Sequence, residues 1–314
     1  MNRAKNSLAQ LRGAIVPLNI CFQDDGVDFN AVCDYVDWLC TQQVPVILLT
    51  YGSTEFAWLS DDDLWQLTEQ VGKAVDRRSM FITSTEFWLP KQTREFLKHA
   101  DACGADAVKV QVTGWDPPSA VMLQNYFDDL SDRDTDIPLL LWWHPLRWSQ
   151  TLPSDILDTF CGLAKRSDII GIKNDGDAFY DYKALIRGTN DQDFAVISGG
   201  LMQNMLYGYG LGSPAYLCPI APFRPDLANQ FFDHVVAGQL EQAQQIINKY
   251  EDPVMDIAGT ANWLCLMKSA IMMLGFYDNN RVGNPSRTCL EGEELERVKR
   301  FYTDVFGVKN VVND

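Results

Sequence analysis

Short apolar segments recur along the chain, and each is followed by a longer stretch with the two-faced pattern of an amphipathic helix. Apolar runs of about four to eight residues between turn signals are typical of buried strands, and their alternation with helices is typical of a parallel sheet. The predicted strands are 14–19, 46–50, 80–84, 107–113, 138–143, 169–173, 194–198 and 214–218. These eight β–α units predict an α/β fold, a (β/α)8 TIM barrel.

Helical patterns between these strands include 29–40, 61–75, 90–103 and 153–164. Ser60, followed by three aspartates, is expected to cap a helix start, because its side chain and the carboxylates satisfy free N–H groups there. Pro153 and Ser154 indicate a second start. Beyond residue 237 the strands stop, and helices are predicted at 240–250, 258–274 and 292–306. We therefore expect a barrel catalytic domain over 1–237 and a C-terminal helical extension over 238–314.

Composition narrows the classes of partner. The chain is 46% hydrophobic and 22% charged, and contains no apolar run long enough to span a membrane. The basic N-terminal segment lacks the features of an export signal, so a cytoplasmic protein without membrane association is expected. A net charge of -16 disfavours nucleic-acid binding, because it repels phosphate backbones. A small-molecule substrate fits this balance better.

Cysteine and histidine usage argues against a metal centre. The eight cysteines include no C-x-x-C pair, which favours buried thiols over a redox role. The three histidines have no spacing typical of zinc or iron ligands. We expect no metal and no cofactor.

Two lysines occupy predicted strands. Lys173 ends an apolar strand, and active sites of such barrels lie at the C-terminal ends of the strands. Burial favours the neutral amine, which can attack a carbonyl to form a Schiff base; alternatively, Lys173 extends to solvent or pairs with Asp175 or Asp177. Lys109 is a rival for this role, but it precedes Thr113, the predicted end of its strand, by four residues, and so lies roughly 13 Å below the mouth at about 3.3 Å per residue. We expect Lys109 in a polar layer of the barrel floor.

Other strand ends carry polar groups suited to a carboxylated ligand. Ser53 and Thr54 follow the second strand in a turn whose hydroxyls and N–H groups suit a carboxylate. The fifth strand runs into His144, which titrates near neutral pH, and Arg147, which can bind a carboxylate in bidentate fashion. Gly199 follows the seventh strand and permits close approach of a ligand, although paired glycines also mark ordinary turns.

In this order the segments resemble the dihydrodipicolinate synthase / N-acetylneuraminate lyase family over nearly the whole chain. That family has G-[ST]-T-G-E after the second strand, Y-N-x-P-x-R after the fifth and G-[IV]-K ending the sixth. The matching positions here are 52–55 (G-S-T-E), Pro145 with Arg147, and 171–173 (G-I-K). The tail is similar at 267–270, 274–275 and 284–285.

The resemblance implies class I aldolase or lyase chemistry. Lys173 would condense with the carbonyl of pyruvate or a related 2-oxo acid, and the imine would act as an electron sink. Ser53 and Thr54 would hold the carboxylate of the 2-oxo acid. Arg147 would bind the polar end of a second substrate. Self-association as a dimer or tetramer is also implied.

The departures from the family concern its tyrosines. The tyrosine of the fifth strand falls on Trp142, and another family tyrosine falls near Trp115. An indole N–H donates but does not titrate, so the usual hydroxyl relay is missing. His144, on the same strand face as Trp142, is the expected replacement, with Glu55 and Asp116 as weaker candidates. Alternatively His144 caps the strand and packs on Trp148, and the two tryptophans fill the pocket, where they narrow it or stack on a substrate.

Three hypotheses follow. The first is a Schiff-base aldolase, lyase or hydratase with a substrate other than that of dihydrodipicolinate synthase. The second is a catalytically reduced homologue that binds a 2-oxo acid for regulation or assembly, which the tryptophan pair favours. The third is a decarboxylase or isomerase centred on His144 that forms no imine.

Overall fold

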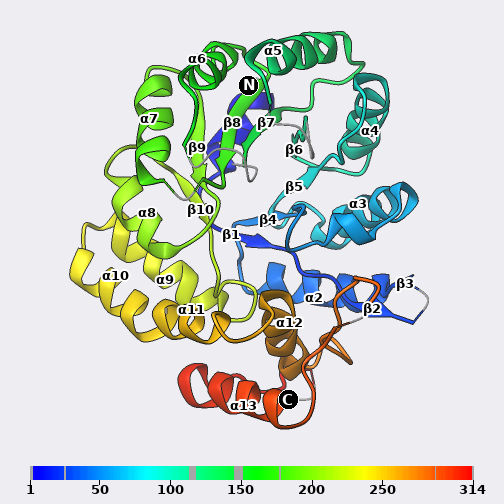
Figure 1. The fold of residues 1–314 in the computed structure, drawn as a ribbon, viewed down its shortest axis with the longest axis vertical. Coiled ribbons are helices and arrows are strands. Elements are labelled where there is room, and N and C mark those ends of the chain that lie inside the picture. Colours follow the sequence, from blue (N-terminus) through cyan, green and yellow to red (C-terminus); the bar gives the residue numbers. More distant parts are fainter. Residues whose placement is uncertain are drawn as a thin grey trace.

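The computed structural model describes residues 3–24, 26–112, 118–144, 151–176, 178–286 and 288–312. Eight parallel strands close into a barrel in the order β1-β10-β9-β8-β7-β6-β5-β4 (Figure 1). Their bounds are Gly13–Pro17 (β1), Val46–Leu48 (β4), Met80–Ser84 (β5), Ala107–Lys109 (β6), Leu139–Trp143 (β7), Ile169–Asn174 (β8), Ala195–Ser198 (β9) and Ala215–Leu217 (β10). The predicted TIM barrel is confirmed.

Helices surround the barrel, as Figure 1 shows. They are α2 (Phe29–Thr41), α3 (Asp61–Val75), α4 (Pro90–Ala102), α5 (Ala120–Asp129), α6 (Ser154–Leu163), α7 (Phe179–Thr189), α8 (Met202–Tyr209) and α9 (Pro225–Val236). Ser60 forms the predicted cap with Asp63, each side chain bonding the other's backbone N–H. None of the described helices is long and apolar enough to cross a membrane.

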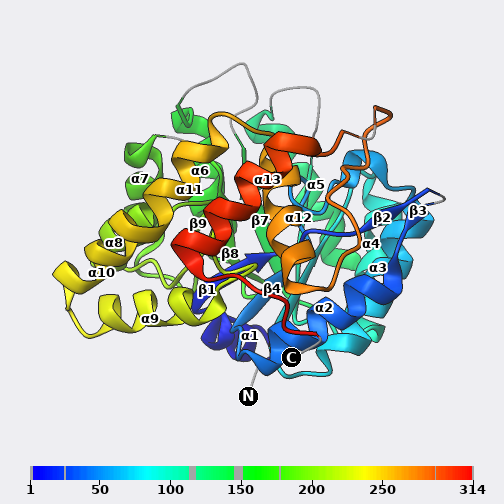
Figure 2. The same cartoon turned by 90° about the horizontal axis from the view of Figure 1, so that it is seen from below.

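The N-terminal helix α1 (Arg3–Gln10) and a hairpin of β2 (Phe22–Gln23) and β3 (Gly26–Val27) are absent from the sequence-based prediction. The side chains of Leu8 and Leu11 pack with the apolar residues that fill the barrel interior, among them Ile15 and Ile82. Figure 2 shows α1 at one end of the barrel. The segment therefore closes the barrel floor with its apolar side chains.

The tail continues with α10 (Leu240–Ile246), a π-helical turn (Ile247–Glu251), α11 (Asp252–Ala258), α12 (Trp263–Leu274), α13 (Gly292–Phe301) and a second π-helical turn (Tyr302–Phe306). The prediction of one helix over 258–274 is wrong at its start. The chain leaves the helix after Ala258, and Asn262 caps α12 by accepting hydrogen bonds from the N–H groups of Leu264 and Cys265. The boundary at residue 237 remains a prediction.

One buried ion pair joins the tail to the barrel. Lys268 of α12 contacts Glu55, in the turn after β4, and both side chains are 1% exposed. Glu55 Oε2 also accepts a hydrogen bond of 2.8 Å from the N–H of Gly283, and Lys268 Nζ donates one of 2.6 Å to the carbonyl of Arg281. Each charge thus has a partner in the low-dielectric interior, where an unpaired charge is costly.

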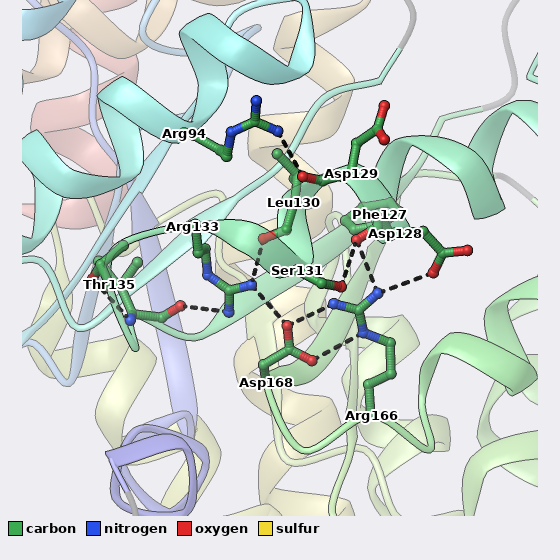
Figure 3. A network of polar contacts seen from close by, with 11 residues as sticks. Arg94, Phe127, Asp128, Asp129, Leu130, Ser131, Arg133, Thr135, Arg166 and Asp168 are labelled. Carbon is green, nitrogen blue, oxygen red and sulfur yellow. Dashed lines mark hydrogen bonds and ion pairs between the residues drawn. The ribbon is translucent and has the colours of Figure 1, made fainter.

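A second charged cluster surrounds Asp168, just before β8 (Figure 3). Its carboxylate accepts hydrogen bonds of 2.8 Å from Arg133 and of 3.0 and 2.8 Å from Arg166. Burial alone would raise the pKa of Asp168, but these bonds outweigh it and lower the pKa to about 2. The same arginines also donate to the carbonyls of Leu130 and Phe127, so the cluster ties the start of β8 to the end of α5.

Asp168→Asn is expected to destabilise the fold at neutral pH by about 2 kcal/mol, because the charged form of Asp168 is bound more tightly in the folded state than in the unfolded chain. Since the folded pKa is depressed, this stabilisation is present above the unfolded pKa of about 4 and is lost as the pH falls toward 2. Urea unfolding of wild type and variant between pH 7 and 3 measures the difference. A difference that stays constant over this range would contradict the role of the charge.

Candidate active site

Lys173 enters the barrel from β8, opposite Trp142 of β7. Its side chain is 5% exposed, and its ammonium group contacts both carboxylate oxygens of Asp175. Residues two apart on a strand share a face, so Lys173 and Asp175 point the same way. The strand pairing with β7 extends to Asp175, because its N–H donates a hydrogen bond of 2.8 Å to the carbonyl of Trp143. The pairing with Asp175, one of the alternatives drawn from the sequence, is thus present in the resting protein.

Asp175 has two further neighbours. The indole Nε1–H of Trp142 donates a hydrogen bond of 2.5 Å to its Oδ2. Gly199, after β9, donates its N–H to the carbonyl of Asn174 at 2.7 Å, and a Cβ added at Gly199 would overlap Asp175 Oδ1. Glycine at position 199 therefore leaves room for the carboxylate. Sequence reasoning gave Asp175 only a pairing role, although its position two residues after Lys173 carried the signal.

Trp142 of β7 stacks its ring with that of His144, with the ring centroids 5.2 Å apart and an interplanar angle of 17°. The shared strand face expected for these two residues is present. His144 itself is exposed at the end of β7. Its stacking partner is Trp142, and a contact with Trp148 lies outside the described residues. The proton-transfer role of His144 stays a prediction.

The expectation for Lys109 is corrected by the structure. Strand β6 ends at Lys109, so this lysine lies at the C-terminal end of its strand and not on the barrel floor. The side chain is buried, and Nζ lies 4.5 Å from the ring centroid of Trp142. The misplacement arose because β6 is only three residues long, whereas the alternation in sequence continues beyond it. Both lysines consequently reach the layer occupied by Trp142.

Gln111 holds the amine of Lys109. Its Oε1 accepts a hydrogen bond of 3.1 Å from Lys109 Nζ. Gln111 is itself fixed by Thr85, because its backbone N–H donates to Thr85 Oγ1 at 2.9 Å and its side-chain amide donates to the Thr85 carbonyl. Both Gln111 and Thr85 are fully buried. These hydrogen bonds fix the orientation of the Gln111 side chain, and with it the position of the Lys109 amine.

The turn after β4 separates two residues that were expected to act together. Ser53 is partly exposed, and Asn19 donates to its carbonyl at 3.3 Å. Thr54 is fully buried; its hydroxyl donates to the carbonyl of Leu18 at 2.8 Å and accepts from the N–H of Thr50 at 3.0 Å. Glu55 adopts the left-handed conformation (φ 57°), which favours glycine. The Thr54 hydroxyl thus holds the turn together.

Arg147, Trp115, Asp116 and Asp177 lie outside the described residues. Among the residues that the structure does describe, no group of three or more His, Cys, Asp or Glu is arranged to hold a metal ion. The cysteines are free, and Cys21, Cys40, Cys218 and Cys265 are buried, as expected of structural thiols.

Known proteins resemble this chain over most of its length. A 4-hydroxy-tetrahydrodipicolinate synthase of Staphylococcus haemolyticus is 25% identical over 72% of this chain and 76% of its own. One of Syntrophus aciditrophicus is 26% identical over 93% of this chain and 98% of its own. An uncharacterized DapA-like lyase of Thermococcus onnurineus is 27% identical over 69% of this chain and 73% of its own.

Solved structures agree on the fold. The dihydrodipicolinate synthase of Aquifex aeolicus superposes with a TM-score of 0.82 at 19% identity, covering 96% of this chain and 100% of its own. The chloride-inhibited dihydrodipicolinate synthase of Acinetobacter baumannii, complexed with pyruvate, gives 0.79 at 23% identity, covering 95% and 99%. At these identities the likeness establishes the fold. The sequence profile of the dihydrodipicolinate synthetase family matches residues 10–303, and the chain therefore belongs to that family.

Proposed function

We propose that this chain is a Schiff-base lyase or aldolase that acts on pyruvate or a related 2-oxo acid, with a second substrate different from that of dihydrodipicolinate synthase. The observation that carries the proposal is the placement of Lys173. It is a buried lysine at the C-terminal end of a barrel strand, and its amine contacts a carboxylate. Membership of the family supports the reaction class.

Lys173 would attack the ketone carbon of the 2-oxo acid and expel the oxygen as water. The resulting iminium withdraws electrons, so the neighbouring carbon can lose a proton or a carbon substituent. Asp175 would be the counter-ion of the ammonium and then of the iminium, and the acceptor of the proton released from the neighbouring carbon. Trp142 would hold this carboxylate in place through its N–H.

Substrate binding is divided among several groups in this proposal. Ser53 would bind the carboxylate of the 2-oxo acid, and the contacts of Thr54 support a role in shaping the turn that presents Ser53. Arg147 would bind the far end of the second substrate. Gly199 would form part of the wall beside Asp175. His144 would exchange protons at the exposed side of Trp142.

A catalytically reduced homologue is the second candidate, and the observation favouring it is an indole at the place of a tyrosine. The position of Asp175 weighs against it, because a carboxylate next to Lys173 restores a group that can move protons. We also propose a cytoplasmic protein that forms dimers or tetramers, as the resemblance implies. No resident cofactor enters this mechanism.

Borohydride trapping tests the proposal. The protein is incubated with pyruvate and other 2-oxo acids, reduced, and digested, and adducts are located by peptide mass spectrometry. We expect an adduct on Lys173 that is absent in Lys173→Ala and unchanged in Lys165→Ala, because Lys165 is exposed on the outside of the barrel. No adduct with any acid would overturn the proposal, and an adduct on Lys109 would reassign the nucleophile.

A further inference from the structure

Lys109 is a second amine in the barrel, and the mechanism above does not use it. Its side chain is 1% exposed. Among the described residues, no carboxylate lies within ion-pair distance of its nitrogen, whereas Lys173 contacts Asp175 directly. Its neighbours are the amide oxygen of Gln111 at 3.1 Å and the face of Trp142. A buried ammonium needs more compensation than one neutral acceptor and one ring provide.

The charges around Lys109 point in the same direction. Burial and the charge of Lys173 hold the pKa of Lys109 well below its usual range, and Asp175 and Glu86 offset this only in part. Within the part of the chain that the structure describes, Lys173, Asp175 and Glu86 are the charged groups that act on Lys109, and His144 stacks on the same Trp142 ring that Lys109 contacts. The surroundings therefore suit a neutral amine with a free lone pair.

We propose that Lys109 rests as a neutral amine and is the proton acceptor that frees Lys173 to attack the substrate carbonyl. This inference rests on the proposed function, since it assigns the proton that Lys173 must lose. Asp175 is the counter-ion of the Lys173 ammonium in the resting protein, whereas the neutral amine of Lys109 has a free lone pair that can accept the proton. Both lysines reach the layer of Trp142, Lys109 over its ring and Lys173 opposite it in the β7–β8 register.

Lys109 and Lys173 together carry one positive charge at each stage of this proton transfer. At rest Lys173 carries the proton and Lys109 is neutral. Transfer of that proton leaves Lys173 neutral and Lys109 as an ammonium, because the repulsion from Lys173 has gone. The Lys173 nitrogen then bonds to the carbonyl carbon, the carbon–oxygen double bond opens, and one proton of that nitrogen passes to the oxygen to give the neutral carbinolamine. When the carbon–oxygen bond of the carbinolamine breaks, the positive iminium forms on Lys173. Lys109 then returns its proton to the departing hydroxide, which leaves as water.

The charge state of Lys109 can be measured without any substrate. If Lys109 is neutral in the folded protein, it takes up one proton on unfolding below its unfolded pKa of about 10.4. Raising the pH therefore favours the folded state. We expect the unfolding equilibrium constant of wild type, relative to that of Lys109→Met, to fall about tenfold per pH unit between about pH 7 and 9. A ratio independent of pH would overturn the proposal. Lys109→Gln replaces Lys109→Met if the latter does not fold.

The proton-transfer role is tested by the rate of imine formation, followed by borohydride quenching at increasing times with pyruvate. We expect Lys109→Met to form the Lys173 adduct about 100-fold more slowly at neutral pH, and the adduct itself to remain on Lys173. Added methylamine should raise the rate of adduct formation in Lys109→Ala at least tenfold. This rescued rate should rise with pH, because the fraction of methylamine present as free amine increases. Methanol, of similar size and without basicity, should not raise the rate.

The outcomes separate this inference from the proposed function. A wild-type adduct on Lys173 with an unchanged rate in the Lys109 variants would overturn the role of Lys109 and leave the proposed function standing. If methanol restores the rate as well as methylamine does, the role of Lys109 is to fill space in the barrel and not to accept a proton, and the inference is overturned. Absence of any wild-type adduct would overturn the proposed function and this role with it, while the pH-dependent unfolding would still report the charge of Lys109.

Discussion

Asp175→Asn is expected to slow the exchange of the methyl protons of pyruvate with D2O by about 1000-fold, as followed by NMR. This exchange requires only the iminium and removal of a proton from the neighbouring carbon, so no knowledge of the second substrate is needed. Asparagine keeps the shape of the side chain and its ability to accept from the Trp142 N–H. It loses the negative charge that faces the iminium and the basicity that removes the proton.

Asp158→Asn is the matched control, because Asp158 is exposed on the outer helix α6 and should exchange at the wild-type rate. Gly199→Ala should reproduce part of the loss, since its added Cβ would displace the Asp175 carboxylate. An Asp175→Asn protein that exchanges as fast as wild type would remove Asp175 from the mechanism and return the proton-transfer role to His144.

Glu55→Gln is expected to destabilise the protein by about 3–5 kcal/mol, because it leaves the ammonium of Lys268 buried without a counter-ion. Burial already lowers the pKa of Lys268, and the charge of Glu55 works against that shift. The midpoint of urea unfolding at neutral pH measures the loss. Because Glu55 directly follows Ser53 and Thr54, the same variant should also weaken binding of the 2-oxo acid.

The double variant Glu55→Gln/Lys268→Met separates the cost of an unpaired charge from the cost of lost packing. It should recover most of the stability, since no charge then remains in the interior. Glu69→Gln is the control, because its pair with Lys73 lies on the exposed face of α3 and its loss should leave the midpoint unchanged. If the double variant is no more stable than Glu55→Gln, the pair does not stabilise the protein through its charges.

Strand and helix positions were readable from the chain because they depend on local periodicity. Strand β5 and helix α3 match their predicted bounds, and Ser60 caps as expected. The bounds of the fourth barrel strand were misjudged for the same reason, since the alternation in sequence continues past Lys109, where β6 ends. Helix α1 was missed because it has few apolar residues. These residues are buried only because they pack against the barrel floor, a contact that the local sequence pattern does not reveal.

The sequence by itself determined the barrel, the family and the place of Lys173 at a strand end, because alternation of faces and order of elements are properties of the chain alone. Only the tertiary structure decided what surrounds Lys173. The register of β6, β7 and β8 brings Trp142 and Lys109 to the same layer of the barrel. Glu55 contacts Lys268 because the C-terminal helix α12 packs against the turn after β4. Such contacts depend on barrel closure and side-chain reach, which local spacing does not encode.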